Sequence, residues 1–163
     1  MTIQIGDRIP DANLSHMTDT GPEAVSTSSY FGGRKVVLFA VPGAFTPTCS
    51  AKHLPGFVEH ADAILARGVD AIGCMAVNDV FVMDAWGKAG GADKIDMLAD
   101  GNGEFTAALG LELDATAFGM GHRSQRFALI AEDGVVEAVF VEGPGEFGVS
   151  SAEHVLGALS GGV

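Results

Sequence analysis

The chain has 163 residues, 47% of them hydrophobic and 18% charged, which is typical of one compact domain spanning residues 1–163. Nine basic and 21 acidic residues give a formal net charge of −12, which disfavours nucleic acid and anionic membranes as partners. No apolar run reaches the roughly 18 residues of a membrane span, and the first ten residues show no secretory pattern, so a cytoplasmic protein is expected.

The first half of the chain alternates between strand-like and helix-like patterns after an irregular acidic opening. Residues 36–41 are continuously apolar and rich in branched side chains, which predicts a strand covered on both faces. Apolar residues then recur at helical spacing from residue 50 to 67, where Pro55 is expected to kink the helix and Gly68 to end it. Residues 69–77 predict a second buried strand, and Asp79 is placed to cap the next helix.

The second half adds shorter elements. Residues 95–98 predict a third strand, residues 104–109 a short helix and residues 151–159 a final helix. The dipeptide Asp133-Gly134 separates two apolar segments, 126–131 and 135–141, and so predicts a β-hairpin. Parallel strands with helical crossovers followed by a hairpin predict an α/β fold of the thioredoxin-like type, with a mixed central sheet and helices on both faces.

Cys49 is the first candidate for chemistry, because it follows the strand 36–41 at the point where a helix begins. Unpaired backbone N–H groups and the partial positive charge of a helix start favour a thiolate over a thiol. Thr46 is placed to bring a hydroxyl near the sulfur, and Pro42 to shield the site from water. We therefore expect Cys49 to be a nucleophile rather than a small buried core residue.

A thiolate at this position also needs a cation, and basic residues are scarce in this chain. Arg123 and Arg126 precede the predicted strand 126–131, which is expected to lie beside the first strand. Either guanidinium would then stabilise the thiolate and polarise an incoming oxygen. The alternative is that these arginines are ordinary surface charges.

The segment around Cys49 closely resembles the peroxiredoxins, specifically the peroxiredoxin 5-like subfamily that includes the plant type II enzymes. The Pro-x-x-x-Thr-x-x-Cys signature is complete, with Pro42, Thr46 and Cys49 in the three fixed positions. The resemblance extends over nearly the whole chain through the segments 53–57, 77–82, 86–87, 126–130 and 133–134.

This resemblance implies a thiol peroxidase with a thioredoxin fold. Cys49 would be the peroxidatic cysteine, Thr46 and Pro42 would shape the peroxide pocket, and Arg126 would be the pocket arginine. The implied reaction is attack of the Cys49 thiolate on hydrogen peroxide or a small alkyl hydroperoxide, which gives a sulfenic acid and requires no cofactor and no metal. A homodimer is also implied, on the side of the molecule that carries Phe45, Phe81, Trp86 and Phe118, although each aromatic could equally belong to the core.

The reductant depends on whether a second cysteine takes part. Some family members carry a resolving cysteine near the C-terminus, but residues 148–153 contain none. Cys74 lies within the predicted strand 69–77, where a core role is favoured over a resolving role because its sulfur would reach Cys49 only after local unfolding. We therefore expect glutathione and glutaredoxin to reduce Cys49, and keep a thioredoxin-dependent two-cysteine cycle through Cys74 as the alternative.

Three other functions compete with a peroxidase. His53 follows Cys49 by four residues and raises a Cys/His hydrolase, although one helical turn gives poor geometry for a nucleophile and its base. A non-catalytic thioredoxin-like binding module would have no use for Thr46 and Cys49 at this junction. Residues 143–148 match the spacing of a dinucleotide fingerprint, but no strand or acidic residue follows to complete it, and the five histidines show no metal-ligand spacing.

Overall fold

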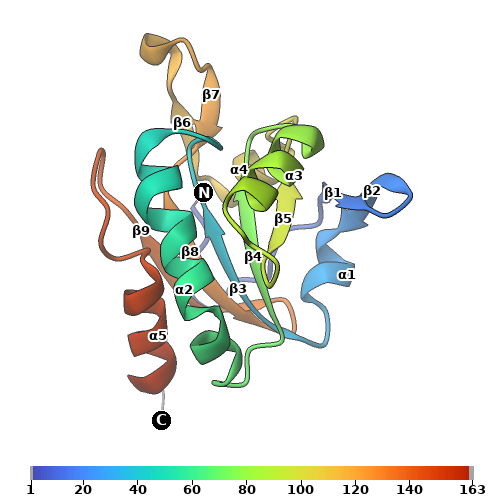
Figure 1. The fold of residues 1–163 in the computed structure, drawn as a ribbon. Coiled ribbons are helices and arrows are strands. Elements are labelled where there is room, and N and C mark those ends of the chain that lie inside the picture. Colours follow the sequence, from blue (N-terminus) through green and yellow to red (C-terminus); the bar gives the residue numbers. More distant parts are fainter. Residues whose placement is uncertain (1, 162–163) are drawn as a thin grey trace.

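The computed structural model describes residues 2–161 and arranges them as a seven-stranded mixed sheet between two layers of helices (Figure 1). The elements in chain order are β1 (Asn13–Thr18), β2 (Gly21–Ser26), α1 (Thr27–Phe31), β3 (Lys35–Ala40), the π-helical turn η1 (Cys49–His53), α2 (Leu54–Leu65), β4 (Ala71–Ala76), α3 (Val80–Ala89), β5 (Asp96–Ala99), α4 (Glu104–Leu109), β6 (Glu112–Asp114), the 3-10 turn η2 (Thr116–Phe118), β7 (His122–Ser124), β8 (Phe127–Glu132), β9 (Val135–Val141) and α5 (Ala152–Gly161).

The strands of the sheet follow the order β2-β1-β5-β4-β3-β8-β9. β3, β4 and β5 are parallel, whereas β1 pairs antiparallel with β5 and β8 pairs antiparallel with β3. The hairpin β8–β9 turns at Asp133 and Gly134, both with positive φ, as the dipeptide predicts. This mixed sheet with helices on both faces confirms the predicted architecture, and β3 lies between β4 and β8 with Cys49 beyond its carboxyl end.

Alternating side chains of the central strands build two separate cores. Val37 and Phe39 of β3 point to the face covered by α2, α3 and α5, whereas Val36 and Leu38 point to the face covered by α1 and α4. The Phe39 ring stacks on Phe57 of α2 with centroids 3.9 Å apart. α2 and α5 lie side by side over the first face (Figure 1). Burial on both faces explains why β3 reads as an uninterrupted apolar run.

The opening of the chain is not irregular as predicted, because it forms the hairpin β1–β2 followed by the short helix α1. α1 begins after Ser26, whose hydroxyl accepts a hydrogen bond from the Ser29 amide. Before β1, the chain runs along the edge of β9, where Arg8 pairs with Val135 and the Val136 amide donates to the Asp7 carbonyl at 2.9 Å. The N-terminal segment therefore covers part of the last strand's free edge.

The helix predicted over residues 50–67 starts with a wide turn instead of being kinked in its middle. Residues 49–53 form a π-helical turn in which the Leu54 amide donates to the Cys49 carbonyl. Pro55 lies in the first turn of the regular helix α2, directly after this π-helical turn, and because proline has no N–H it cannot donate a hydrogen bond to the turn before it. The irregularity thus precedes Pro55 and places Cys49 and His53 at the two ends of one widened turn.

A buried carboxylate connects β5 to α4 on the face away from Cys49. Asp100 is 2% exposed and accepts hydrogen bonds from the Phe105 amide, the Thr106 amide and the Thr106 hydroxyl. These partners satisfy two of the amide groups that a helix start leaves unpaired. Asp100 therefore fixes the position of α4 relative to the sheet.

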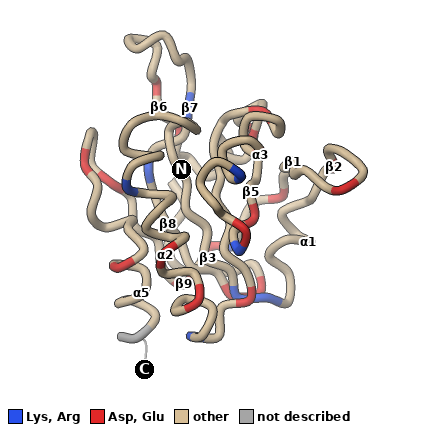
Figure 2. The backbone as a smooth tube through the Cα atoms, in the orientation of Figure 1, with Lys and Arg blue, Asp and Glu red and all other residues tan. Residues whose placement is uncertain are grey.

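Acidic positions are spread over helices, strands and loops, whereas Lys and Arg positions are few (Figure 2). Among residues 2–161, none of the helices combines the length and apolarity that crossing a bilayer demands.

Candidate active site

Cys49 lies in the first helical turns after the loop that leaves β3. Helical geometry begins at Pro47, so the Cys49 amide belongs to the first turn, where N–H groups have no partner in a preceding turn. The Cys49 side chain is fully buried, packed in the core cluster that includes Val41 and Phe57. An uncompensated thiolate would be costly in this environment, so its polar neighbours determine its charge state.

The loop between β3 and Cys49 is held by local and long-range hydrogen bonds. Thr46 donates its hydroxyl to the Gly43 carbonyl at 2.7 Å, and its own carbonyl accepts the first helical hydrogen bond from Ser50. The Ala44 amide donates to the Asn78 side chain at 2.9 Å. Phe45 adopts φ 64°, a left-handed conformation that costs an L-residue about 1–2 kcal/mol. With its hydrogen donated to Gly43, the Thr46 hydroxyl keeps lone pairs free to accept a hydrogen bond.

The structure places the Arg126 guanidinium against the Cys49 sulfur, with Nη2 donating to Sγ at 3.1 Å. This contact follows from sheet register, because β8 pairs antiparallel with β3 and Phe127 lies opposite Ala40. Arg126 therefore stands beside the loop that β3 leads into. The sequence pattern alone left Arg123 and Arg126 as alternatives, and the family resemblance implied Arg126. Arg123 instead donates to the carbonyls of Met120 and Val77, which ties the β6–β7 hairpin to the end of β4.

A cavity of about 340 Å³ opens beside this guanidinium. Its wall joins the β3 loop to the segment that follows β9, and its lining residues are Pro42, Thr48, Leu113, Gln125, Arg126, Glu142, Gly143, Pro144, Gly145 and Glu146. The segment 143–148, which matched a dinucleotide fingerprint in spacing, is the loop on one side of this cavity. Pro42 and Arg126 both face the cavity, so a small molecule in it would meet the groups around Cys49.

His53 is buried one widened turn after Cys49, but both of its ring nitrogens are engaged with other groups. Nδ1 lies 2.8 Å from Arg126 Nη1, and Nε2 lies 2.9 Å from the Ser150 carbonyl. Burial and then the charge of Arg126 lower the pKa of His53 to about 3. The nitrogen that could accept a proton already accepts a hydrogen bond from Arg126, so His53 is not arranged as a general base for Cys49.

Cys74 lies in β4, opposite Phe39 of β3 and Met97 of β5, and is fully buried. Burial raises the pKa of the Cys74 thiol well above its usual range, and the proximity of Cys49 adds to this effect. Both cysteines are free thiols in this structure. In this state Cys74 is a neutral thiol within a strand that is hydrogen-bonded on both sides.

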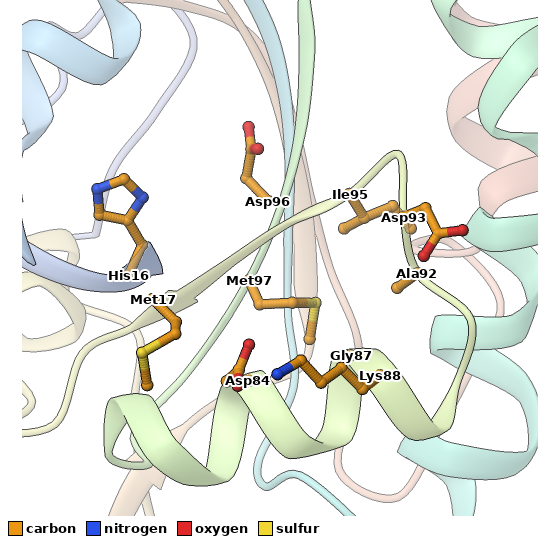
Figure 3. A pocket seen from close by; sticks show the side chains of 10 residues that line it. All are labelled: His16, Met17, Asp84, Gly87, Lys88, Ala92, Asp93, Ile95, Asp96 and Met97. Carbon is orange, nitrogen blue, oxygen red and sulfur yellow. Dashed lines mark ion pairs between the residues drawn. The ribbon is translucent and has the colours of Figure 1, made fainter. Parts of the chain in front are cut away.

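A second hollow, of about 210 Å³, lies between α3, β1 and β5 (Figure 3). Three of its polar side chains already have partners, since Lys88 pairs with Asp84 at 2.9 Å and Asp96 accepts the Tyr30 hydroxyl at 2.7 Å. No cysteine is among its lining residues. Within residues 2–161, no group of three His, Cys, Asp or Glu side chains is arranged to hold a metal ion.

Sequence reasoning did not single out Glu142, which the structure places behind His53. Its Oε2 accepts hydrogen bonds from the Gly148 amide, the Ser150 amide and the Ser150 hydroxyl. Burial alone would raise the pKa of Glu142, but these hydrogen bonds outweigh it and leave the pKa below the usual range. The only sequence signal for this role is an acidic residue directly after the apolar strand β9.

Comparisons with known proteins agree with this geometry. The chain matches the Redoxin family model over residues 4–156. The chloroplastic peroxiredoxin-2E-2 of Oryza sativa subsp. japonica is 52% identical over 164 residues, covering 97% of this chain and 73% of that relative. Peroxiredoxin-2B of Arabidopsis thaliana is 50% identical over 159 residues, covering 96% and 98%.

A solved structure, reduced Prx3 from Vibrio vulnificus in complex with hydrogen peroxide, superimposes with a TM-score of 0.95 at 53% identity. The match covers 97% of this chain and 99% of that one. The similarity confirms the predicted thioredoxin-like fold.

Proposed function

This chain belongs to the Redoxin family, as a peroxiredoxin of the peroxiredoxin 5-like type, and from that membership we propose that it reduces hydrogen peroxide and small organic hydroperoxides through Cys49. The observation that carries the proposal is the Arg126 hydrogen bond to the Cys49 sulfur at 3.1 Å, at the side of a cavity large enough for a small hydroperoxide. A cation in contact with a fully buried thiol favours the thiolate, which is the nucleophilic form.

In the proposed reaction, the Cys49 thiolate attacks one peroxide oxygen in line with the O–O bond. An S–O bond forms, the O–O bond breaks, and the departing hydroxide or alkoxide takes up a proton to leave as water or an alcohol. The sulfur is thereby oxidised to a sulfenic acid. Arg126 stabilises negative charge as it moves from sulfur to the leaving oxygen, and the Thr46 lone pairs accept the peroxide O–H. Pro42 limits the access of water.

The test is peroxide consumption by the purified protein with a thiol donor. Cys49→Ser should abolish turnover, because a hydroxyl with its much higher pKa provides no comparable nucleophile. The matched control is Cys74→Ala, which removes the other thiol without burying an unpaired hydroxyl in β4. Substantial peroxidase activity in Cys49→Ser would refute the proposed role of Cys49.

We propose that the sulfenic acid is reduced by glutathione, with glutaredoxin completing the cycle. The raised pKa of Cys74 and its position between two paired strands support an external thiol over Cys74. A disulfide between Cys49 and Cys74 would require α-carbons within about 7 Å of each other. A cycle linked to glutathione fits the reducing cytoplasm, which is where we propose that the protein acts.

Mass spectrometry after one equivalent of peroxide separates the two cycles. A glutathione adduct on Cys49, with undiminished glutathione-driven turnover in Cys74→Ala, is the expected result. A Cys49–Cys74 disulfide together with loss of activity in Cys74→Ala would favour the thioredoxin-dependent cycle. Assays with thioredoxin and with glutathione plus glutaredoxin, run side by side, identify the more efficient reductant.

We further propose a homodimer that uses the exposed aromatic side chains near the active-site loop. Phe45, Phe81 and Phe118 are 55%, 63% and 82% exposed, respectively. They belong to one region, because the Asn78 side chain bonds the Ala44 amide and Arg123 ties the β6–β7 hairpin to Val77. Trp86, in contrast, is 2% exposed and belongs to the core. A second copy of the chain would bury this aromatic surface.

A further inference from the structure

His53 is a buried polar side chain to which the proposed peroxide chemistry assigns no step. It is fully buried, and its ring lies among three aromatic rings, 4.9 Å from Phe39, 5.7 Å from Phe57 and 5.0 Å from Phe147 between centroids. A neutral hydrocarbon would suit such surroundings better than an imidazole. Its polar contacts therefore indicate what the ring does.

The hydrogen bonds of His53 define its tautomer. A guanidinium only donates, so His53 Nδ1 must accept the hydrogen bond from Arg126 Nη1 at 2.8 Å. The ring proton then lies on Nε2, which donates to the Ser150 carbonyl at 2.9 Å. His53 thus presents a fixed lone pair to Arg126, and this orientation depends on the position of one backbone carbonyl.

The two terminal nitrogens of the Arg126 guanidinium have different hydrogen-bond partners. Nη1 donates to His53 and Nη2 donates to Cys49 Sγ, so the planar guanidinium bridges the imidazole and the reacting sulfur. Because the guanidinium is planar and rigid, the hydrogen bond of Nη1 to His53 restricts where Nη2 can lie relative to the Cys49 sulfur. The Phe147 ring, 5.8 Å from Arg126 Cζ, adds a further contact from the loop after β9.

Ser150, whose carbonyl accepts from His53, is itself held by Glu142 through its amide and hydroxyl. The carboxylate accepts hydrogen bonds from the Gly148 amide at 2.7 Å, the Ser150 amide at 2.8 Å and the Ser150 hydroxyl at 2.6 Å. The Glu142 amide donates to the Arg126 carbonyl at 3.0 Å, which anchors this loop to the strand end that carries Arg126. Glu142 is 9% exposed, so these hydrogen bonds are largely shielded from water.

We propose that His53 is a positioning residue for Arg126. The hydrogen bonds that Glu142 accepts from residues 148 and 150, here called the Glu142 clasp, set the imidazole orientation that makes this possible. This role rests on the proposed peroxidase reaction, in which Arg126 must meet the sulfur as charge leaves it. Neither His53 nor Glu142 touches the reacting atoms, so both act through the guanidinium.

The test measures the second-order rate of Cys49 oxidation by peroxide in a stopped-flow instrument. Trp86 is the chain's one tryptophan and donates to the Ser50 hydroxyl at 3.0 Å, next to Cys49, so its fluorescence provides the signal. His53→Leu removes both polar contacts and should lower the rate by roughly tenfold or more, the usual effect of losing a hydrogen bond to a charged group. His53→Asn keeps an acceptor on the side of Nδ1 and should recover most of that loss.

Double variants separate positioning from simple loss of structure. In an Arg126→Ala background, His53→Leu should change the remaining rate by less than about twofold, because the group through which it acts is gone. Equal losses from His53→Leu in both backgrounds, or no recovery in His53→Asn, would overturn the proposal. If peroxide does not oxidise Cys49 in the unmodified protein, the proposed function fails instead, so the two failures are distinguishable.

A second variant tests the contribution of Glu142 without altering the His53 imidazole. Glu142→Gln offers a neutral amide in place of a carboxylate that accepts three hydrogen bonds, and should lower the oxidation rate by roughly three- to tenfold. This loss should also disappear in the Arg126→Ala background. Glu153→Gln is the matched control, since Glu153 is an exposed carboxylate of α5 that pairs with His60. A full rate in Glu142→Gln would show that the clasp does not act on Arg126.

Discussion

The Arg126 guanidinium hydrogen-bonds the buried sulfur of Cys49 and stabilises its charge. A hydrogen bond to a charged group contributes about 1.5–3 kcal/mol, whereas an exposed ion pair contributes only about 0–1 kcal/mol. The Arg126–Cys49 contact belongs to the stronger class because Cys49 is fully buried and Arg126 is partly buried.

Arg126→Lys tests whether the planar shape of the guanidinium, in addition to its charge, contributes to the rate of the reaction with peroxide. A lysine ammonium is a point charge that cannot reproduce the planar bridge between His53 and Cys49. The rate constant for peroxide should fall about tenfold or more despite the conserved charge. Competition kinetics against a second peroxidase measure this value directly. A rate within twofold of the unmodified protein would mean that charge alone is sufficient.

His53 also makes the stability of the protein depend on pH. In the unfolded chain His53 binds a proton below about pH 6.5, whereas in the folded state its pKa is about 3. Between these values the unfolded state holds the additional proton, so the free energy of unfolding decreases as the pH falls. The slope approaches about 1.4 kcal/mol for each pH unit. Above pH 6.5 the effect disappears.

Urea denaturation at pH 6.5, 5.5 and 5.0 tests this expectation. The unmodified protein should lose stability over that range faster than His53→Asn, which has no group to protonate. Equal slopes for the two proteins would contradict the low pKa of His53.

At the scale of the elements, the sequence predicted the buried strands well because burial on both faces leaves a long apolar run. β9 and α4 match their predicted bounds, and β3 starts one residue earlier than predicted. The strands β1 and β2 were missed because they lie toward one edge of the sheet, where their residues are partly exposed and the pattern is weak. β6 and β7 have three residues each, too few for any periodicity.

The parts of the site that could be predicted are those whose residues lie close together in the sequence. Cys49, Thr46 and Pro42 lie within one short segment, so their spacing carries the signal. The contacts of Arg126 with His53 and of His53 with Ser150 join residues 73 and 97 positions apart, respectively. Such partners depend on sheet register and on the path of the loop after β9, which local patterns do not determine.

The carboxylate that connects β5 to α4 gives a prediction at this scale. Asp100→Ala leaves two buried amides without their acceptor and should reduce the free energy of unfolding by about 1–3 kcal/mol. Asp100→Asn keeps one acceptor oxygen and should lose less. Urea denaturation midpoints measure both effects. Since α4 covers the face away from Cys49, the peroxide rate per folded molecule should stay constant, and an unchanged midpoint in Asp100→Ala would be inconsistent with the capping role.

At the scale of the whole molecule, the exposed aromatic side chains predict self-association. Phe81→Ser combined with Phe118→Ser removes two large apolar groups with little effect on the core, because both side chains are mostly exposed. Losing interface aromatics of this kind should weaken the dimer roughly 10- to 100-fold. Sedimentation velocity over a concentration series measures the dissociation constant.

The matched control for this experiment is Ile5→Ser, which removes an apolar side chain that is 68% exposed on the N-terminal segment. It should leave the dimer unchanged. A dissociation constant that is the same in the double variant and in the control would place the contact elsewhere, and a monomeric unmodified protein would exclude the dimer.

The pairing of the N-terminal segment with β9 has a consequence for how the chain folds during synthesis. Residues 6–9 are translated well over a hundred residues before their partners at residues 134–136. At the usual elongation rate this delay is on the order of ten seconds. Closing such a distant contact has a high entropic cost and is slow. Residues 6–9 are therefore translated long before they dock, and until they dock the free edge of β9 is open to pairing with another nascent chain.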